Sequence, residues 1–99
     1  MNEKTFYSLD VYENDIDGLE SEKYVRIDYI KVAPEERGQG IARKLLREAI
    51  LEAKTYNLPI FMVASELEPE TDLARLVNFY EDEGFSIYAC IGDSVLMKY

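Results

Sequence analysis

An amphipathic helix followed at once by a short apolar segment is the feature that most narrows the possible folds of this chain. From Ile41 to Tyr56 the apolar residues recur at helical spacing and occupy one half of the helix circumference. Asn57 and Pro59 end the helix, and Pro59–Ala64 is continuously apolar, as in a strand that is buried on both faces. A helix that leads into such a strand predicts a parallel crossover connection.

Two strands are predicted before this helix. Residues 5–12 alternate apolar and polar side chains, which is the period of a half-buried strand, and residues 23–32 are rich in apolar and β-branched side chains. The polar, acidic segment 14–22 contains Gly18 and joins the two strands, so we expect an antiparallel hairpin. Pro34 prevents the second strand from continuing.

A second helix and a closing hairpin are predicted after the apolar segment. Thr71 is placed to cap a helix that runs to about Glu83, and Gly84 stops it. Residues 85–90 and 94–99 then form a hairpin across Gly92 and Asp93. The predicted order over residues 1–99 is β-β-α-β-α-β-β, in one domain, because a chain of 99 residues supports a single core.

The residue types that are missing exclude several kinds of chemistry. The chain has no histidine and one cysteine, Cys90, which removes Ser-His-Asp and Cys-His nucleophile systems, histidine-based metal sites and an internal disulfide. Cys90 has no basic neighbour in the sequence, so we expect a buried, inert thiol and no bound metal. No targeting segment or membrane span is evident, which favours a cytoplasmic protein that does not contact membranes.

The charge is unevenly distributed along the chain. The net charge is −9, but residues 31–54 hold six basic and four acidic side chains. This basic segment carries +2 and the rest of the chain carries −11, which argues against nucleic-acid binding by the whole surface. A local site for an anion remains possible within the basic segment. Its basic residues are Lys31, Arg37, Arg43, Lys44, Arg47 and Lys54.

A glycine-containing loop at the start of the first helix indicates such a site. The loop follows a strand and opens a helix, so Gly38 and Gly40 allow a ligand to approach unpaired backbone N–H groups at the positive end of the helix dipole. A dinucleotide-binding loop would need a small residue where Arg43 stands, and no Gly-Lys-Ser/Thr sequence follows as in a nucleotide triphosphate loop. The alternative to an anion site is that Gly38 and Gly40 only form a tight turn at the start of the helix.

Two motifs in this order resemble the Gcn5-related N-acetyltransferase (GNAT) family. Residues 37–42, Arg-Gly-Gln-Gly-Ile-Ala, match its acetyl-CoA loop pattern Arg/Gln-x-x-Gly-x-Gly/Ala, and Val32-x-Pro34 is similar to the end of the preceding strand. Residues 79–85, Phe-Tyr-Glu-Asp-Glu-Gly-Phe, are similar to the family's Tyr-Glu-x-x-Gly-Phe motif. The resemblance covers residues 25–99.

The resemblance implies a fold and a cofactor site. The fold would be α/β (α+β), a mixed, mostly antiparallel sheet that is splayed where coenzyme A enters, with two packed helices. Backbone N–H groups of the loop would hold the pyrophosphate of acetyl-CoA, and two strand residues would offer main-chain groups to the pantetheine arm and acetyl carbonyl. The implied cofactor-binding residues are Ile30, Val32, Arg37, Gly38, Gln39, Gly40, Ile41 and Ala42.

The resemblance also implies acetyl transfer to a primary amine by direct attack. Tyr80 would be the general acid that protonates the departing thiolate, the alternative being a packed helix aromatic. The amine needs a base, and without histidine Asp28 is the first candidate, because we expect it on the same strand face as Ile30 and Val32. An exposed strand aspartate is the alternative reading.

The acceptor side differs from the family pattern. Members usually begin with a strand and two helices that wall the acceptor groove, and there is no room for these before Thr5, so we expect an open groove. The acidic segments 13–22 and 66–72 are expected near it, which favours a cationic protein acceptor, and a homodimer could complete the groove. A non-catalytic acetyl-CoA-binding module that regulates a partner and an acidic mimic of nucleic acid remain the alternatives.

Overall fold

The computed structural model describes residues 5–36, 38–65 and 72–99. These residues form a single sheet with two α-helices and one turn of 3₁₀ helix, η1, at Pro34–Glu36. The order of strands and helices is the predicted one. The elements are β1 (Phe6–Glu13), β2 (Lys23–Lys31), α1 (Ile41–Lys54), β3 (Ile60–Ser65), α2 (Leu73–Asp82), β4 (Ser86–Ile91) and β5 (Ser94–Lys98).

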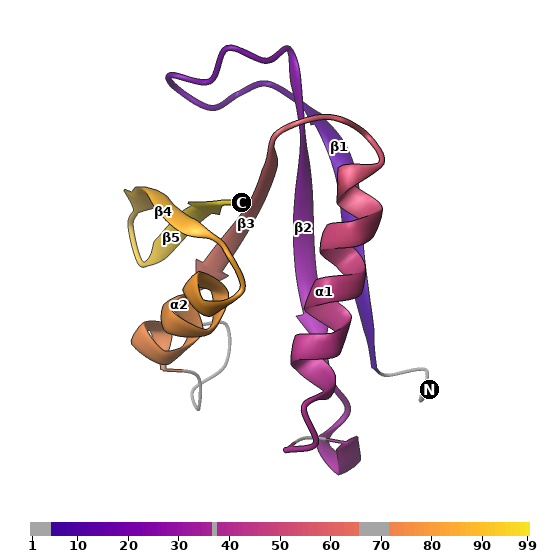
Figure 1. The fold of residues 1–99 in the computed structure, drawn as a ribbon. Coiled ribbons are helices and arrows are strands. Elements are labelled where there is room, and N and C mark those ends of the chain that lie inside the picture. Colours follow the sequence, from indigo (N-terminus) through magenta and orange to yellow (C-terminus); the bar gives the residue numbers. More distant parts are fainter. Residues whose placement is uncertain (1–4, 37, 66–71) are drawn as a thin grey trace.

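The sheet has the spatial order β1-β2-β3-β5-β4 (Figure 1). β2 and β3 run parallel, which confirms the predicted crossover through α1, and the other neighbouring strands are antiparallel. The predicted hairpins β1–β2 and β4–β5 are both present. The mixed, mostly antiparallel sheet with two helices is therefore confirmed.

Both helices pack on the same face of the sheet, which we call the helix face. The apolar stripe of α1 predicted from its spacing is buried there, and α2 contributes Val77 and Tyr80 to the same core. Alternate residues of the central strands point into this core, for example Met62 of β3 and Met97 of β5. Each aliphatic side chain buried in this way stabilises the fold by about 1.5–3 kcal/mol.

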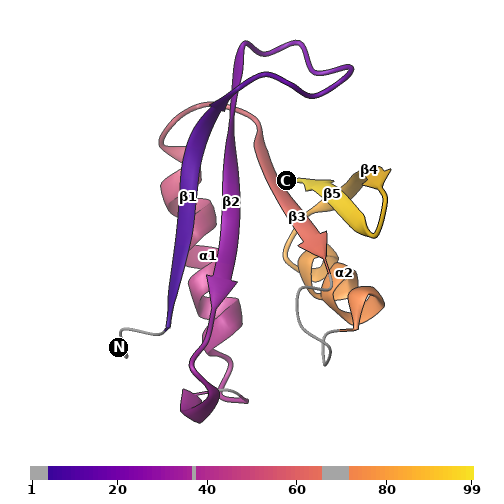
Figure 2. The same cartoon turned by 180° about the vertical axis from the view of Figure 1, so that it is seen from behind.

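The opposite face, which we call the second face, has no helix over it in the described part of the chain (Figure 2). Tyr24, Phe61 and Leu96 form a smaller buried cluster on this face. The β1–β2 loop covers the cluster with two apolar side chains, Ile16 and Leu19. The loop therefore folds back over the aromatic side chains at this end of the sheet.

Two further expectations are corrected by the structure. Asp72, rather than Thr71, caps α2: its side chain accepts hydrogen bonds from the backbone N–H groups of Ala74 and Arg75. Thr71 itself lies outside the described residues. Cys90 is exposed, not buried, because β4 is an edge strand that neither helix covers.

Candidate functional site

β2 and β3 separate at the centre of the sheet. Only three residue pairs join them, Val25–Ile60, Arg26–Phe61 and Ile27–Met62, although β2 continues to Lys31 and β3 to Ser65. Figure 1 shows the two strands diverging toward their C-terminal ends. Beyond Ile27, β2 therefore pairs with no strand of the described residues on the side that faces β3.

The loop after β2 leads to a helix start without a side-chain cap. Gly40 is the N-cap residue of α1, in the left-handed conformation with φ of 74°, and it has no side chain to accept from the first N–H groups of the helix. Gly38 has φ of 81°. A Cβ built on either glycine meets no described atom within 4 Å, so the space over both backbones is open. Unpaired N–H groups and the positive end of the helix dipole therefore face accessible space.

A pocket of about 270 Å³ lies at this helix start and reaches across to α2. It brings together five of the eight residues expected to bind the cofactor, together with Phe79 of α2. Its lining is Val32, Glu36, Gly38, Gly40, Ile41, Ala42, Arg43 and Phe79. Of the remaining three, Gln39 turns its amide to the carbonyl of Glu35, Ile30 packs against the core of the helix face, and Arg37 lies outside the described residues.

Glu83 holds two arginines of α1, a contact that the sequence patterns do not reveal. Arg43 Nη1 and Arg47 Nε donate to its two carboxylate oxygens, and only 5% of the Glu83 side chain is exposed. The hydrogen bond from Arg47, with that from Arg43, holds the pKa of Glu83 below its ordinary value. Arg43 also lies over the Phe79 ring, 5.2 Å from its centroid. The basic segment is thus partly neutralised, and Arg43 is fixed at the edge of the pocket.

Tyr80 lies in α2 beside the C-terminal cap of that helix. The N–H of Phe85 donates to the carbonyl of Tyr80, and the N–H of Gly84 to that of Glu81, which is the Schellman arrangement that a glycine with φ of 108° permits. The rings of Tyr80 and Phe85 contact each other, with centroids 6.2 Å apart. The segment from Tyr80 to Phe85 therefore also ends α2. This agrees with the alternative interpretation of Tyr80 as a packed aromatic residue of the helix.

The Tyr80 hydroxyl nevertheless reaches solvent. The residue is 6% exposed, and burial raises the pKa of Tyr80 to about 12. No hydrogen bond joins this hydroxyl to another described residue, whereas every fully buried side-chain oxygen or nitrogen in the described chain has a partner. An accessible phenol that keeps its proton at neutral pH can donate a hydrogen bond to a bound molecule.

Asp28 lies on the second face, and the expectation that it shares a face with Ile30 is wrong. Ser8 pairs with Tyr29 and Leu9 with Ile27, so Asp28 is the extra residue of a β-bulge in β2. The bulge reverses the alternation of side chains, and Ile27 and Ile30 both pack on the helix face.

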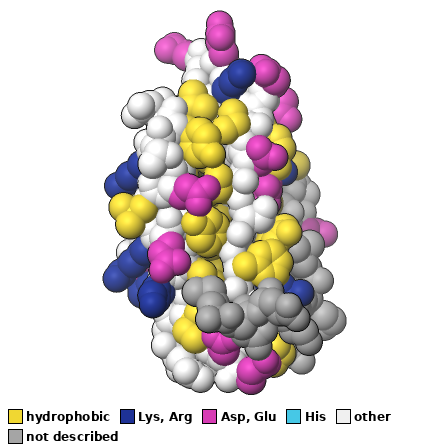
Figure 3. Space-filling view, turned by 90° about the vertical axis from the view of Figure 1, so that its right-hand side faces the viewer, with side chains coloured by type: hydrophobic (Ala, Val, Ile, Leu, Met, Phe, Trp, Pro, Cys, Tyr) yellow, Lys and Arg dark blue, Asp and Glu magenta, His cyan; other side chains and the backbone are white. Residues whose placement is uncertain are grey.

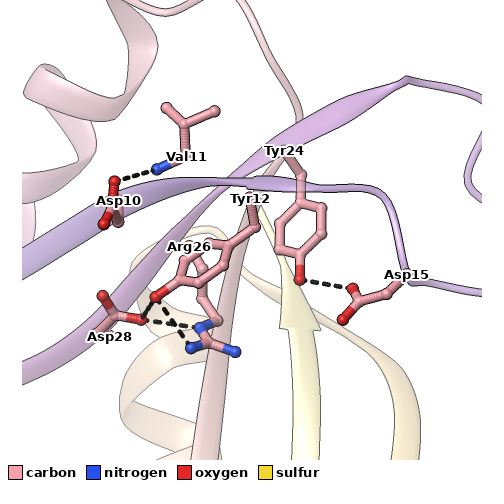
Figure 4. A network of polar contacts seen from close by, with 7 residues as sticks. All are labelled: Asp10, Val11, Tyr12, Asp15, Tyr24, Arg26 and Asp28. Atoms are coloured by element: carbon pink, nitrogen blue, oxygen red, sulfur yellow. Dashed lines mark hydrogen bonds and ion pairs between the residues drawn. The ribbon is translucent and has the colours of Figure 1, made fainter.

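Asp28 belongs to a small polar cluster, which Figure 4 shows from close by. Its Oδ1 atom accepts hydrogen bonds from the Tyr12 hydroxyl at 2.7 Å and from Arg26 Nε at 2.8 Å. The hydrogen bond to Asp28 raises the pKa of Tyr12. Among the described residues, Oδ2 of Asp28 accepts no hydrogen bond, and 19% of the side chain is exposed. One carboxylate oxygen is therefore held and the other is available at the point where β2 leaves β3.

The acidic β1–β2 loop is not near the splayed ends of the strands, contrary to expectation. It precedes Lys23, at the end of β2 that remains paired with β3. Tyr24 donates to the Asp15 carboxylate and Tyr88 to the Asp17 carbonyl, which fasten the loop to the second face. Residues 66–71 of the other acidic segment lie outside the described chain.

Within residues 5–36, 38–65 and 72–99, no helix is long and apolar enough to cross a membrane, and no group of His, Cys, Asp and Glu side chains could hold a metal ion.

Comparison with known proteins gives a family match and one curated relative. Residues 6–87 match the family model described as "Acetyltransferase (GNAT) domain". The chain is 32% identical over 74 residues to "Putative acetyltransferase YjbC" of Bacillus subtilis (strain 168). That match covers 74% of this chain but 36% of YjbC, so the chain spans about a third of the length of this relative.

The fold is shared with several solved structures. Arabidopsis thaliana NAA60 in complex with acetyl-CoA gives a TM-score of 0.69 at 17% identity, covering 97% of this chain and 64% of NAA60. The NatC complex bound to Gag peptide and CoA gives 0.64 at 19% identity, covering 93% of this chain and 56% of the other. The anti-CRISPR protein AcrVA5 gives 0.65 at 22% identity, covering 92% of this chain and 97% of AcrVA5.

Proposed function

Because the chain belongs to the GNAT acetyltransferase family, we propose that it transfers the acetyl group of acetyl-CoA to a primary amine on a cationic protein. The observation that carries this proposal is the uncapped start of α1, where two left-handed glycines border a pocket without filling it. Acetyl-CoA, when bound, supplies an acetyl thioester and an anionic pyrophosphate.

The residues present fit this cosubstrate. Backbone N–H groups of the segment 37–42 would hold the pyrophosphate, and Arg43 stands beside them with its guanidinium fixed by Glu83. Main-chain groups of Ile30 and Val32 would bind the pantetheine arm, because β2 has left β3 before these positions. NAA60, which shares the fold, is solved in complex with acetyl-CoA, and this supports the choice of cosubstrate.

Tyr80 and Asp28 would act from different sides of the sheet. Tyr80 packs in the core of the helix face, and its protonated phenol would donate a hydrogen bond to the departing sulfur. A phenol with a pKa of about 12 holds its proton more tightly than a thiol with a pKa near 8.5, so solvent would complete the protonation. Asp28 would accept the proton of an amine that approaches from the second face, through its available Oδ2 atom.

The choice of a protein acceptor rests on charge and on one neighbour. The chain carries −9 overall, which favours encounter with a cationic surface. The NatC complex, whose fold is similar, is bound to a peptide as well as to CoA. A lysine side chain or an N-terminal amine would satisfy both observations.

Calorimetric titration with acetyl-CoA tests the proposed loop. Gly40→Val places a branched side chain in the open space, and Arg37→Glu places a negative charge beside the pyrophosphate. We expect each change to weaken binding about tenfold or more. Gly92→Val is the matched control, because Gly92 also has a positive φ, 58°, with no described atom within 4 Å of an added Cβ, but lies in the β4–β5 turn. Unchanged affinity in both loop variants would refute the assignment.

Turnover is a separate measurement. Release of free CoA in the presence of lysine-rich peptides should exceed release in buffer. If acetyl-CoA binds through the loop but no peptide or protein is acetylated, the chain is a non-catalytic binding module, and acetyl transfer is refuted.

A further inference from the structure

Thr5 is a buried polar residue at the start of β1. Apart from the tyrosines, it is the only polar or charged residue that is buried in the part of the chain that the structure describes, at 2% exposed. Burying a hydroxyl is unfavourable unless it is hydrogen-bonded, and Thr5 makes two hydrogen bonds to the chain beyond β2. The Thr5 side chain therefore links the start of the sheet to the turn that precedes the proposed cofactor loop.

The two hydrogen bonds of Thr5 have a fixed direction. The backbone N–H of Ala33 donates to Thr5 Oγ1 at 2.8 Å. The single proton of the hydroxyl is therefore left for the Glu36 carboxylate, whose Oε1 atom lies 3.1 Å away. A hydrogen bond to a charged acceptor is stronger than one between neutral groups. The Thr5 hydroxyl thus holds the Glu36 side chain at the start of β1, across 31 positions of the sequence.

Glu36 is the one acidic residue among the described residues that line the pocket at the start of α1. It ends η1 and lines the pocket together with Gly38 and Gly40. Arg43 is the basic residue of the same lining, and it is already paired with Glu83. The Glu36 side chain therefore shares a pocket with the N–H groups that would bind a pyrophosphate.

A loose carboxylate in this pocket would compete with an anionic ligand. The uncapped start of α1 attracts negative charge, whether the charge belongs to a phosphate or to a glutamate side chain. Like charges within one pocket also repel each other. The surface does not offset this effect, because the chain carries −9, and Figure 3, which faces the side of α1 and β1, shows acidic side chains spread along that side.

We propose that Thr5 is a positioning residue for acetyl-CoA: its hydroxyl holds the Glu36 carboxylate and so keeps this charge away from the N–H groups at the start of α1. Breaking the contact would release an internal competitor for the pyrophosphate. The inference rests on the proposed acetyl-CoA site, and it assigns to that site a control by the chain itself. It does not depend on the roles of Tyr80 and Asp28 or on the acceptor.

Calorimetric titration of Thr5 variants with acetyl-CoA tests the inference. Thr5→Val keeps the shape of the side chain but removes the hydroxyl, and release of the Glu36 carboxylate should weaken binding about fivefold or more. Thr5→Ser keeps the hydroxyl and should bind within about twofold of the unmodified chain. Thr55→Val is the matched control, because the Thr55 hydroxyl donates to the Glu52 carbonyl at the other end of α1, and its loss should leave the affinity unchanged.

A double variant separates release of the carboxylate from general damage to the turn. Thr5→Val also removes the partner of the buried Ala33 N–H, so all titrations are made well below the lowest Tm of the set. Adding Glu36→Gln removes the charge but does not restore a partner to Ala33. The double variant should therefore bind acetyl-CoA within about twofold of Glu36→Gln alone. A purely structural role of Thr5 would leave its affinity as low as that of Thr5→Val.

Glu36→Asp gives a test that leaves the hydrogen bond between Thr5 and Ala33 in place. Its carboxylate is one methylene shorter and loses the contact with Thr5, so binding should again weaken about fivefold or more. Glu36→Gln alone should bind at least as tightly as the unmodified chain. These two variants decide the question if Thr5→Val does not fold.

The outcomes distinguish this inference from the proposed function. Absence of acetyl-CoA binding in the unmodified chain would overturn the proposed cosubstrate, and this inference with it. If the unmodified chain binds acetyl-CoA, an unchanged affinity in Thr5→Val or in Glu36→Asp would overturn this inference alone. A loss in Thr5→Val that Glu36→Gln does not restore would do the same.

Discussion

At the scale of single residues, Tyr80 combines a structural contact with an accessible hydroxyl. Its ring supports the cap of α2 through Phe85, while its phenol remains protonated because burial raises its pKa to about 12. Tyr80→Phe keeps the ring and removes only the hydroxyl. We expect kcat to fall roughly 10²-fold, with acetyl-CoA affinity and thermal stability nearly unchanged.

The matched control for this change is Tyr88→Phe in β4. Among the described residues, the Tyr88 hydroxyl donates a hydrogen bond only to the Asp17 carbonyl, on the second face. Steady-state kinetics should show the loss in the Tyr80 variant alone. In the unmodified protein, the rate should show no decline from ionisation of this phenol below about pH 11, since its pKa is about 12. A normal kcat in Tyr80→Phe would assign the residue to packing only.

Asp28 gives a second prediction at this scale. Asp28→Asn keeps the size of the side chain but cannot accept the proton of an amine, so kcat/KM should fall roughly 10²-fold or more at neutral pH. Asp10→Asn in β1 is the control, because the Asp10 carboxylate accepts only from the neighbouring Val11 N–H. A kcat/KM in Asp28→Asn equal to that of the unmodified protein would exclude Asp28 as the base.

The position of Asp28 also shows a limit of sequence reasoning. Strict alternation along β2 would place Asp28 and Ile30 on one face, and a single bulged residue reverses that order. Nothing in the types of residue from Ile27 to Ile30 specifies the bulge, because it depends on how Ser8 and Leu9 of β1 pair with them. The expected burial of Cys90 is wrong for a related reason, because whether a strand lies at an edge depends on the final strand order.

At the scale of elements, local signals gave more reliable predictions. The spacing in α1, the apolar run of β3 and the glycine after α2 depend on neighbouring residues, and these elements appear within two residues of their expected ends. The pocket at the start of α1 was predictable from Gly38 and Gly40. The pairing of Glu83 with Arg43 and Arg47 of α1 was not predictable, because Glu83 lies 40 and 36 positions away from them in the sequence.

Glu83 gives a prediction about how α1 and α2 are held together. Glu83→Gln removes the charge that two arginines share, and it should lower stability by about 1–2 kcal/mol, or Tm by roughly 4–16 °C. The pKa of Glu83 is lower in the folded chain than its ordinary value of 4.5, so this stabilisation is present above about pH 4.5 and declines as the pH falls through the lowered value.

Thermal unfolding of the Glu83→Gln variant and the unmodified chain between pH 3 and 7 measures this effect. The difference in Tm should be constant from about pH 6 to 7 and shrink in acid. Glu81→Gln, at an exposed position two residues earlier in α2, should change Tm little at any pH. A difference that does not depend on pH would mean that the ion pairs with Glu83 do not stabilise the helix contact.

At the scale of the whole molecule, the net charge should govern the encounter with the acceptor. With acetyl-CoA saturating, kcat/KM for a cationic peptide should fall as salt shortens the screening length from roughly 30 Å at 0.01 M to roughly 8 Å at 0.15 M. Saturation is needed because CoA is itself anionic. If kcat/KM does not change with salt concentration, or if neutral amines are preferred, the net negative charge of the chain does not promote binding of the acceptor.

Charge-neutralising variants locate the source of this effect. Changing Glu66, Glu68 and Glu70, which lie outside the described residues, to glutamine should flatten the salt dependence. Neutralising Asp17, Glu20 and Glu22 removes the same number of charges from the loop at the paired end of β2, and should flatten it less. Equal effects would mean that total charge matters and position does not.

The three residue pairs between β2 and β3 have a consequence for how the chain acquires its fold. On one side of this seam lie β1, β2 and α1, and on the other β3, α2, β4 and β5, and each group is continuous in the sequence. The seam pairs residues that are 35 positions apart, such as Val25 and Ile60, and the β3–β5 pairs inside the second half span a similar length of chain, for example 37 positions from Phe61 to Lys98. Three residue pairs reward this closure at the seam, against five or more at every other junction of the sheet, so we expect the parallel seam to form late in folding.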